Sequence, residues 1–461
     1  MDFYRPLLEK ALFPAFEAAR GRPTVSLLRY LQGTETWSAD ALRDLQGGLL
    51  RRLLGHAYAH TAYYRTLLDD LGLRPDDFQS VADLRHVPLL DRTLANQTLD
   101  ERTAMAPPHA VVHKTTSGTT GIPVVVKYNA ESRHWRDATR WRGYGWAGYR
   151  VGMRALHYWG EPPAPDSWVH RGKQVLDRAL KRDHYVDCIV RSEAALARAA
   201  GEIERFQPEV IVAYAAGAAA LARFVNEHGL RRWRDTPVIV GAERLWPYER
   251  KQITAAFGPA FETYGCREFM LVGAECEEHD GMHTSMETMI VEILVREADG
   301  RLRAARPGES GEVAITDLHN LACPMIRYLT GDVAVARGDG RCSCGSGLVK
   351  IGPIEGRVAQ TLQDGQGNAV GGLVFNVLIG VLDHVARNFQ VVQKLDGSVV
   401  MRVVPNRGDR LPDKENRAIH DFAAKYLPGT RFTIEIVDEI PLTPMGKRNV
   451  VVVEKRAHAR A

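Results

Sequence analysis

A loop from Lys114 to Pro123 is dense in hydroxyl side chains and glycine. Apolar, strand-like runs lie on both sides of it, at 110–113 and 124–127. A loop between two strands, with hydroxyls and glycine-exposed backbone N–H groups, is suited to wrapping a polyphosphate. An ordinary Ser/Thr/Gly turn is the alternative. The Gly-Lys-Ser/Thr ending and following helix of a P-loop NTPase are missing, which disfavours that class.

Bulk composition narrows the class of protein only a little. The chain has 461 residues, enough for two or three domains, with 60 basic against 56 acidic residues and no long basic run. The longest apolar stretch, Val210 to Leu221, is too short to span a bilayer, and no signal peptide opens the chain. We therefore expect a soluble, cytoplasmic protein with neither a nucleic-acid nor a membrane partner. A homodimer is left open.

Hydrophobic periodicity predicts an α/β fold with a smaller α+β region after it. Residues 1–105 have helical spacing, including a helix that begins at the N-cap Ser38. Between 106 and 357 strands alternate with helices, which implies α/β layers and a largely parallel sheet. The predicted strands include 154–159, 210–214 and 237–240, and the predicted helices 192–205, 216–227 and 248–257. From 361 to 461 the pattern is that of a small α+β domain, with a boundary near 356–362.

Five separated segments, taken in order, carry a resemblance to a known family. They are the loop at 114–123, Gly241-Ala242-Glu243, Tyr264-Gly265-Cys266-Arg267-Glu268, Arg327-Tyr328-Leu329-Thr330-Gly331-Asp332 and Pro441-Leu442-Thr443-Pro444-Met445-Gly446-Lys447. Together they resemble the motifs of the adenylate-forming superfamily of acyl- and aryl-CoA ligases. The resemblance is closest to phenylacetate–CoA ligases and their CapK-like relatives from capsule clusters. Each motif is weak alone, but five in register are a strong signal.

The resemblance implies a large N-terminal adenylate-forming domain with layered α/β sheets and a small, mobile α+β C-terminal domain. Residues 1–105 would be the helical part of the large domain, and 106–357 its nucleotide- and acid-binding part. The small domain, 361–461, would carry the catalytic Lys447.

A nucleotide site follows from the same resemblance. The loop residues that would hold the phosphates of ATP are Thr116, Ser117, Gly118, Thr119, Thr120 and Gly121, with Thr119 also catalytic. The residues that would line the rest of the nucleotide are Gly241, Ala242, Glu243, Tyr264, Gly265, Arg267, Asp332 and Arg357. Among these, Tyr264 would stack on adenine, and Asp332 would accept hydrogen bonds from both ribose hydroxyls. Glu268 would hold Mg²⁺.

The chain departs from the family pattern in three places. Ile122 stands where many relatives have Lys, and Arg267 replaces a Thr that contacts the α-phosphate. Arg267 could still reach that phosphate as a planar donor, or it could mark altered chemistry. The acidic hinge residue expected after Arg357 is missing from Val358-Ala359-Gln360.

The acid-binding wall of the family falls on aromatic residues of this chain: His157, Tyr158, Trp159 and Tyr214. Aromatic walls suit an aryl acid. The same residues are equally compatible with a hydrophobic core.

Cysteine and histidine residues suggest a metal site. Cys276, His283, Cys342 and Cys344 near glycines suit a tetrahedral Cys₃His zinc site, with His279 as the substitute for His283. Reduced thiols without metal are the alternative. In phenylacetate–CoA ligase relatives the corresponding segments meet around a structural zinc, which the resemblance therefore implies here. Cys188 and Cys323 are interpreted as packing residues.

The function that the resemblance implies is ATP-dependent activation of a carboxylic acid, with an aryl or arylacetic acid as the expected substrate. MgATP would give an acyl-adenylate and pyrophosphate, and coenzyme A would then take the acyl group. Two alternatives stay open. The acceptor could be an amine, a hydroxyl, a carrier protein or a small inorganic nucleophile. The chain could also be a catalytically inactive nucleotide-binding protein of a polysaccharide cluster.

Overall fold

The computed structural model describes residues 4–106, 111–115, 124–160, 168–297, 300–357, 361–375, 385–406, 408–442 and 449–454, with Leu378 and Leu382. The chain divides into two compact units. The larger comprises 1–245 and 252–354, and the smaller comprises 246–251 and 355–461.

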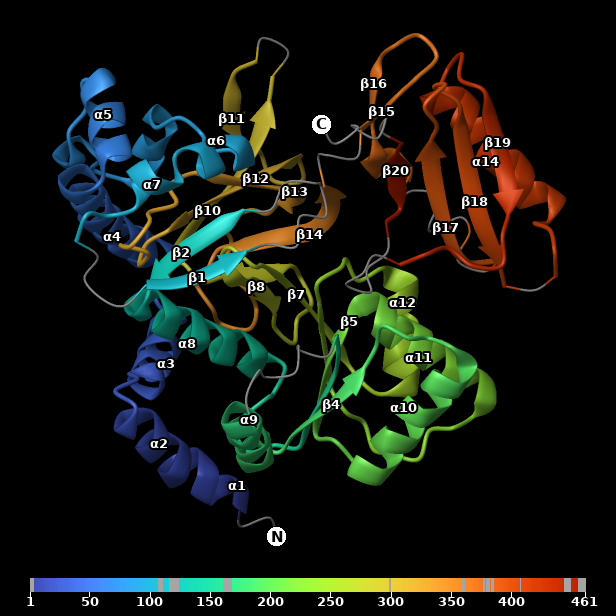
Figure 1. Ribbon diagram of the computed structural model, residues 1–461, viewed down its shortest axis with the longest axis horizontal. Helices are drawn as coiled ribbons and strands as arrows, with labels where there is room; N and C mark the ends of the chain where they lie inside the picture. The colour runs from blue at the N-terminus through green and yellow to red at the C-terminus, as the bar shows by residue number, and fades with distance from the viewer. Residues whose placement is uncertain are drawn as a thin grey trace. The chain divides into compact units, whose positions relative to one another are not determined.

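A long mixed sheet forms the body of the larger unit. Within the described residues it has 12 strands in the order β11-β10-β12-β13-β14-β9-β8-β7-β6-β5-β3-β4 (Figure 1). The strands of the parallel part are β3 (Ala155–Trp159), β4 (Asp183–Asp187), β5 (Val210–Tyr214), β6 (Val238–Gly241) and β7 (Ala260–Cys266). The others are β8 (Met270–Glu275), β9 (Met282–Thr284), β10 (Met289–Arg296), β11 (Leu302–Ala304), β12 (Ser310–Asp317), β13 (Tyr328–Ala336) and β14 (Lys350–Arg357). Strand direction changes at β7, which pairs in parallel with β6 and antiparallel with β8.

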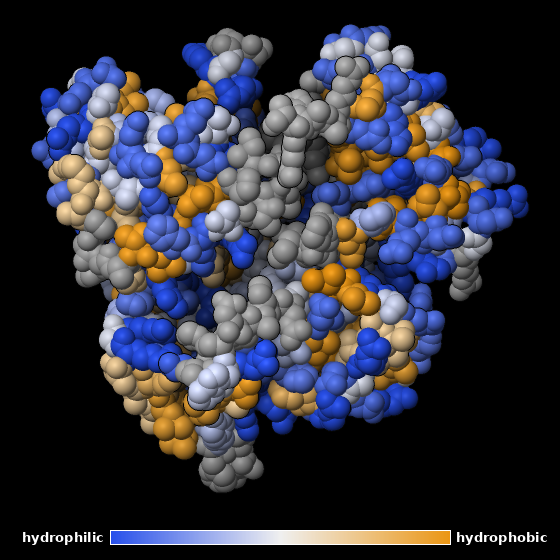
Figure 2. All heavy atoms as spheres, viewed as in Figure 1, coloured by the Kyte–Doolittle hydropathy of each residue, from blue (hydrophilic) through white to orange (hydrophobic). Residues whose placement is uncertain are grey.

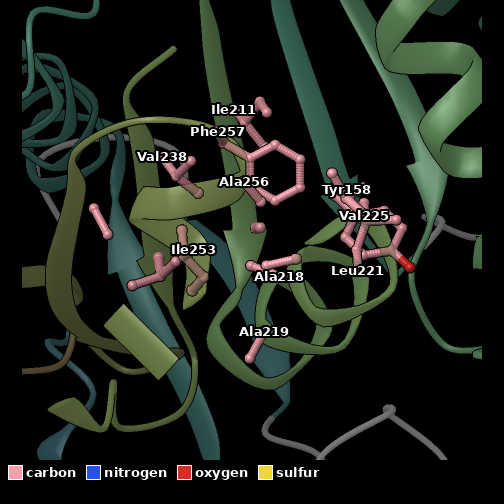
Figure 3. Close-up of a cluster of buried hydrophobic side chains, with 14 of the residues drawn as sticks. Tyr158, Ile211, Ala218, Ala219, Leu221, Val225, Val238, Ile253, Ala256 and Phe257 are labelled. Atoms are coloured by element: carbon pink, nitrogen blue, oxygen red, sulfur yellow. The ribbon is translucent and has the colours of Figure 1, made fainter. Parts of the chain in front are cut away.

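Helices cover one face of the parallel part. They are α10 (Glu193–Phe206), α11 (Ala215–His228) and α12 (Pro247–Ala256), whereas α9 (Trp168–Lys181) lies on the other face, where the carbonyl oxygen of Leu180 accepts a hydrogen bond from Tyr4. Ile211 and Val238 of the sheet pack with Leu221 and Ile253 of the helices in a continuous hydrophobic core (Figure 3). Strands β5 and β6 are buried on both faces, which explains their unbroken apolar sequences. The prediction of α/β layers is confirmed.

The opposite face is covered by α8 (Ala130–Trp146) and the N-terminal helices. Trp141 of α8 and Phe13 pack there against Val212 and Ile239 of the sheet. Helix α8 also crosses β8 closely, because a Cβ at Gly143 would lie 2.4 Å from Cδ2 of Leu271. A larger residue at this position would force the Leu271 side chain to shift.

The N-terminal region is helical, as predicted. Its helices are α1 (Tyr4–Leu7), α2 (Phe13–Ala19), α3 (Thr24–Thr34), α4 (Ala39–His60), α5 (Ala62–Asp70), α6 (Arg92–Gln97) and α7 (Leu99–Arg102). Ser38 caps α4 by accepting a hydrogen bond from the backbone N–H of Ala41 at 3.2 Å. Leu50 and Leu54 of α4 pack against Ile290 of β10 and against Leu318, which follows β12.

Two strands flank the hydroxyl-rich loop. Strands β1 (Val111–Thr115) and β2 (Val125–Asn129) pair antiparallel, with Thr115 opposite Val125. Val126 and Tyr128 of β2 pack against Tyr264 and Val272 of the main sheet. The loop itself, 116–123, lies outside the described residues, and the strand–loop–strand prediction is confirmed for its two strands.

The smaller unit is α+β. Its described elements are β15 (Thr361–Gln363), β16 (Ala369–Gly371), β17 (Ala386–Gln393), β18 (Val399–Pro405), α14 (Asp413–Tyr426), β19 (Phe432–Ile436) and β20 (Val451–Val453). Four of them form a sheet of order β19-β18-β17-β20. Met401 and Val403 of this sheet pack against Ile419 of α14.

None of the helices in the described ranges is both long and apolar enough to cross a bilayer. On the face shown in Figure 2, hydrophobic residues (orange) occur in small groups among hydrophilic ones (blue).

Candidate active site

Four parallel strands end at the same edge of the main sheet, and each ends on a residue of a predicted motif. Strands β3 and β5 end at Trp159 and Tyr214, β6 ends at Gly241, and β7 ends just after Tyr264 and Gly265. Ligands of open α/β sheets bind outside the carboxyl ends of the strands. This edge is therefore the candidate site.

Two of the predicted aromatic residues meet at this edge. The rings of Trp159 and Tyr214 have centroids 4.1 Å apart and are tilted by 56°. A Cβ at Gly241 would lie 2.7 Å from Oγ1 of Thr263 and 3.9 Å from the Trp159 ring, so the close approach requires glycine.

The other two predicted wall residues point elsewhere. Tyr158 lies in the hydrophobic core beneath the edge, where its hydroxyl is buried and has no hydrogen-bond partner among the described residues (Figure 3). His157 lies on the opposite face of β3, stacked on Tyr185 and 3.2 Å from a carboxylate oxygen of Asp183. Side chains alternate along a strand, so neighbouring residues of β3 cannot line one wall.

The segment after β6 has a strained backbone. Ala242 has φ of +69°, a left-handed conformation that is uncommon for a residue other than glycine. The next residue, Glu243, accepts a hydrogen bond from the backbone N–H of Ala216 at 3.2 Å. A carboxylate at this point satisfies a free N–H in the first turn of α11.

Strands β7 and β8 are joined by a tight hairpin turn at 267–269, and Glu268 lies in it. Gly265 is required just before the turn, because a Cβ there would lie 2.3 Å from the carbonyl oxygen of Met270. Met270 itself has φ of +66°. Glycine follows Tyr264 in this motif because the backbone of Met270 comes too close for a larger residue.

The third and fourth motifs meet through a hydrogen bond. The Tyr264 hydroxyl donates to Oδ2 of Asp332 at 2.9 Å and lies 3.3 Å from Oγ1 of Thr330. Burial and then the charge of Asp332 raise the pKa of Tyr264 well above its ordinary value. The phenol therefore stays protonated and keeps donating to the carboxylate.

Glu268 is 5% exposed, and two side chains approach one of its carboxylate oxygens. The Tyr328 hydroxyl donates to Oε1 of Glu268 at 3.4 Å, and a guanidinium nitrogen of Arg92 lies 3.8 Å from the same oxygen. Burial, followed by the charges of Glu268 and Asp332, holds the pKa of Cys266 well above its usual range. This thiol is protonated at neutral pH and is not a nucleophile.

Arg267 connects the turn to the hydroxyl-rich loop. Its Nη1 donates to the carbonyl oxygen of Thr115 at 3.1 Å, where β1 enters that loop. The predicted loop residues 116–121 lie outside the described residues, as does Lys447. Nothing is described for the side chain of Arg357.

A second cluster gathers the four predicted metal ligands. Sγ of Cys276 lies 3.8 Å from Sγ of Cys342, and Sγ of Cys344 lies 3.5 Å from Nε2 of His283. All four ligand atoms are within 4.8 Å of one another. His283 Nδ1 lies 3.3 Å from the carbonyl oxygen of Leu348, which leaves Nε2 facing the thiols.

The substitute ligand stands outside this cluster. His279 Nδ1 lies 3.1 Å from Oε2 of Glu275 instead. The sequence predicted His283 as the ligand and His279 as its substitute, and the pairing of β9 with β8 and β14 brings His283 to the cysteines.

Sequence reasoning missed two arginines at the candidate site, Arg92 and Arg136. Both reach the turn that carries Glu268. No motif contains either residue, and an arginine on a helix gives no local signal of a contact more than a hundred positions away.

Sequence comparison finds relatives over most of the chain. Phenylacetate–coenzyme A ligase of Thermus thermophilus is 28% identical over 381 residues, 81% of this chain and 82% of the relative. The enzyme of the same name from Escherichia coli is 30% identical over 316 residues, 66% of this chain and 69% of the relative. Protein CapK of Staphylococcus aureus is 23% identical over 54% of each chain. No protein-family model matches the sequence.

A solved structure shows the same fold. The 2-hydroxyisobutyryl-CoA ligase in the postadenylation state, in complex with an acyl-AMP compound, covers 92% of this chain with a TM-score of 0.70 and 17% identity. The fold prediction is therefore confirmed. The motifs that meet at the sheet edge, the shared fold and the identity to two phenylacetate–coenzyme A ligases lead to one conclusion. The chain belongs to the phenylacetate–coenzyme A ligase family.

Proposed function

We propose that the protein is an ATP-dependent acid–coenzyme A ligase. A carboxylate attacks the α-phosphorus of ATP, which gives an acyl-adenylate and releases pyrophosphate. The thiol of coenzyme A then attacks the acyl carbon, which gives the thioester and releases AMP. The observation that carries the proposal is the meeting of Tyr264, Asp332 and Glu268 at the carboxyl edge of the parallel strands, in a chain whose relatives are named phenylacetate–coenzyme A ligases.

The first step depends on alignment and charge neutralisation more than on covalent catalysis. We assign Asp332 to the ribose hydroxyls, and Tyr264, whose ring lies beside it, to the adenine. The hydroxyls and amides of 116–121 would hold the β- and γ-phosphates. Lys447 would contact the carboxylate and the α-phosphate as negative charge develops there.

Glu268 fits a magnesium ligand. It is a buried carboxylate whose polar contacts are long, 3.4 Å to Tyr328 and 3.8 Å to Arg92, so an oxygen remains for a hard cation. Magnesium bound there would neutralise phosphate charge. Residues of the protein would align the nucleotide and the acid.

The acid is assigned to the aromatic pair at the sheet edge. The tilted rings of Trp159 and Tyr214 favour a flat, apolar acyl group, and we propose an aryl or arylacetic acid. His157 and Tyr158 are left out of this assignment because their side chains point to the two faces of the sheet.

The experiment is pyrophosphate release across a panel of aryl, arylacetic and aliphatic acids, with and without coenzyme A. We expect release with an aryl or arylacetic acid and thioester formation only when coenzyme A is present. Product formed equally well with an amine or hydroxyl acceptor in place of coenzyme A would favour another acceptor. No release with any acid would contradict the proposal and favour a nucleotide-binding protein.

The hydroxyl of Tyr264 provides a prediction for the nucleotide site. Tyr264→Phe removes the donor to the buried Asp332, and a hydrogen bond to a charged group is worth about 1.5–3 kcal/mol. We expect KM for ATP to rise roughly tenfold or more, with a smaller change in kcat. Steady-state pyrophosphate exchange measures both. An unchanged KM for ATP would remove Asp332 from the nucleotide site.

We also propose that the four-residue cluster holds a structural zinc. With Zn–S near 2.3 Å and Zn–N near 2.0 Å, a tetrahedral site has S···S edges of about 3.8 Å and S···N edges of about 3.5 Å. The distances of 3.8 Å from Cys276 to Cys342 and 3.5 Å from Cys344 to His283 match these edges. Four protein ligands leave no open position, so the ion would take no part in the reaction.

A further inference from the structure

We infer that Arg136 is a positioning residue for Glu268, through the backbone of the turn and not through the carboxylate. The inference rests on the proposed function, because it concerns how the proposed magnesium ligand is placed. Arg136 lies on α8, in the second turn after β2, and only 7% of it is exposed.

The contacts of Arg136 converge on the turn between β7 and β8. Nη1 donates to the carbonyl oxygen of Glu268 at 2.6 Å, a short distance for a charge-assisted hydrogen bond. A turn residue lacks the partners that a strand ladder supplies, so this carbonyl depends on a side-chain donor. The guanidinium therefore fixes the peptide that carries Glu268.

A buried carboxylate keeps the charged guanidinium in place. Nη2 of Arg136 lies 2.7 Å from Oδ2 of Asp317 at the end of β12, and Nε donates to Oγ of Ser132 at 3.1 Å. Ser132 also donates to Asp317 at 3.3 Å. A buried charge is tolerated when it is paired and hydrogen-bonded, and here the three partners fix its orientation as well.

The same guanidinium touches the hairpin that supports the hydroxyl-rich loop. Its central carbon lies 4.4 Å above the ring of Tyr128 on β2. Arg136 thus contacts both the Glu268 turn and the strand that leaves the loop. A single side chain therefore fixes the Glu268 turn and strand β2 relative to each other.

Lysine cannot replace this arrangement. Its single ammonium group cannot donate to Glu268, Asp317 and Ser132 in the planar fork geometry that arginine provides. A misplacement of about 1 Å at a catalytic group can cost on the order of 100-fold in rate. For Arg136→Lys we expect the magnesium concentration that gives half-maximal, acid-dependent pyrophosphate exchange to rise about tenfold.

A matched control lies on the same helix. Arg142 is also buried and paired with a carboxylate, with 2.7 Å between Nη1 and Oε1 of Glu287, and it makes no described contact with Glu268. Arg142→Lys should lower the thermal stability but leave the half-maximal magnesium concentration within about twofold of wild type.

A double-mutant cycle with Glu268→Gln tests whether Arg136 acts through Glu268. Glu268→Gln alone should raise the magnesium requirement, and adding Arg136→Lys to it should have little further effect. If Arg136→Lys folds poorly, Ser132→Ala, which removes one partner of the guanidinium, should still raise the requirement about threefold.

The outcomes separate this inference from the proposed function. If the wild-type protein gives no exchange with any acid, or Glu268→Gln leaves the magnesium requirement unchanged, the proposed function or its metal ligand is wrong. If Glu268→Gln raises the requirement and neither Arg136→Lys nor Ser132→Ala does, only the positioning role of Arg136 is overturned. Fully additive effects in the double variant would also overturn it.

Discussion

Replacing Lys447 with alanine is expected to reduce acid-dependent pyrophosphate exchange by about 100- to 1,000-fold. A donor aimed at charge that develops in the transition state has about this effect on kcat when it is removed. Lys447 lies in a Pro-x-Thr-x-x-Gly-Lys segment that resembles the family motif and is outside the described residues. KM for ATP should change much less, because the phosphates and ribose have partners of their own.

The second half-reaction provides the control for Lys447. Thioester formation from a preformed acyl-adenylate and coenzyme A should be largely retained, since the α-phosphate charge is then being released and not built up. Lys425→Ala, an exposed lysine on α14 of the same unit, should leave both half-reactions unchanged. Exchange at the wild-type rate in Lys447→Ala would contradict the role of this lysine.

Loss of a zinc ligand is expected to have the largest effect on stability. The purified protein should contain one zinc per chain, and Cys276→Ala should remove it. Zinc binding at a structural site contributes on the order of 10 kcal/mol to folding, so the variant should lose several kcal/mol of unfolding free energy. Metal analysis and denaturant unfolding measure the two quantities.

Another buried cysteine provides the control for the zinc prediction. Cys188 is fully buried beside the core of the parallel sheet and away from the cluster. Cys188→Ala should keep the zinc and lose about 1 kcal/mol, the cost of a small cavity. A metal-free wild-type protein of unchanged stability, or a Cys276→Ala variant that keeps its zinc, would contradict the assignment.

Local rules were enough for much of the fold. Ser38 predicted the start of α4 because an N-cap side chain satisfies free backbone N–H groups whatever the surroundings. The continuous apolar run of β5 predicted a buried parallel strand for a similar reason. The residues named for the nucleotide came from motif resemblance, and two of them, Tyr264 and Asp332, are joined by a hydrogen bond.

The local sequence did not predict which side chains of β3 face the acid-binding wall. The family resemblance assigns His157, Tyr158 and Trp159 to one wall, but strand alternation turns Tyr158 into the core on the face opposite His157. Which face borders a site depends on what packs against each side of the sheet. Likewise, strand pairing, and not spacing along the chain, brought His283 into the cysteine cluster in place of His279.

The element types, the α/β layering and the chemistry of the motif residues follow from the amino-acid sequence, because these depend on periodicity, caps and side chains within a few residues. The hydrogen bond from Tyr264 to Asp332 and the contact of Arg136 with the Glu268 turn come from the packing of the folded chain. Such contacts join residues 68 and 132 positions apart. They exist only after the strand order and the crossing of α8 over β8 have been set, and no local pattern records either.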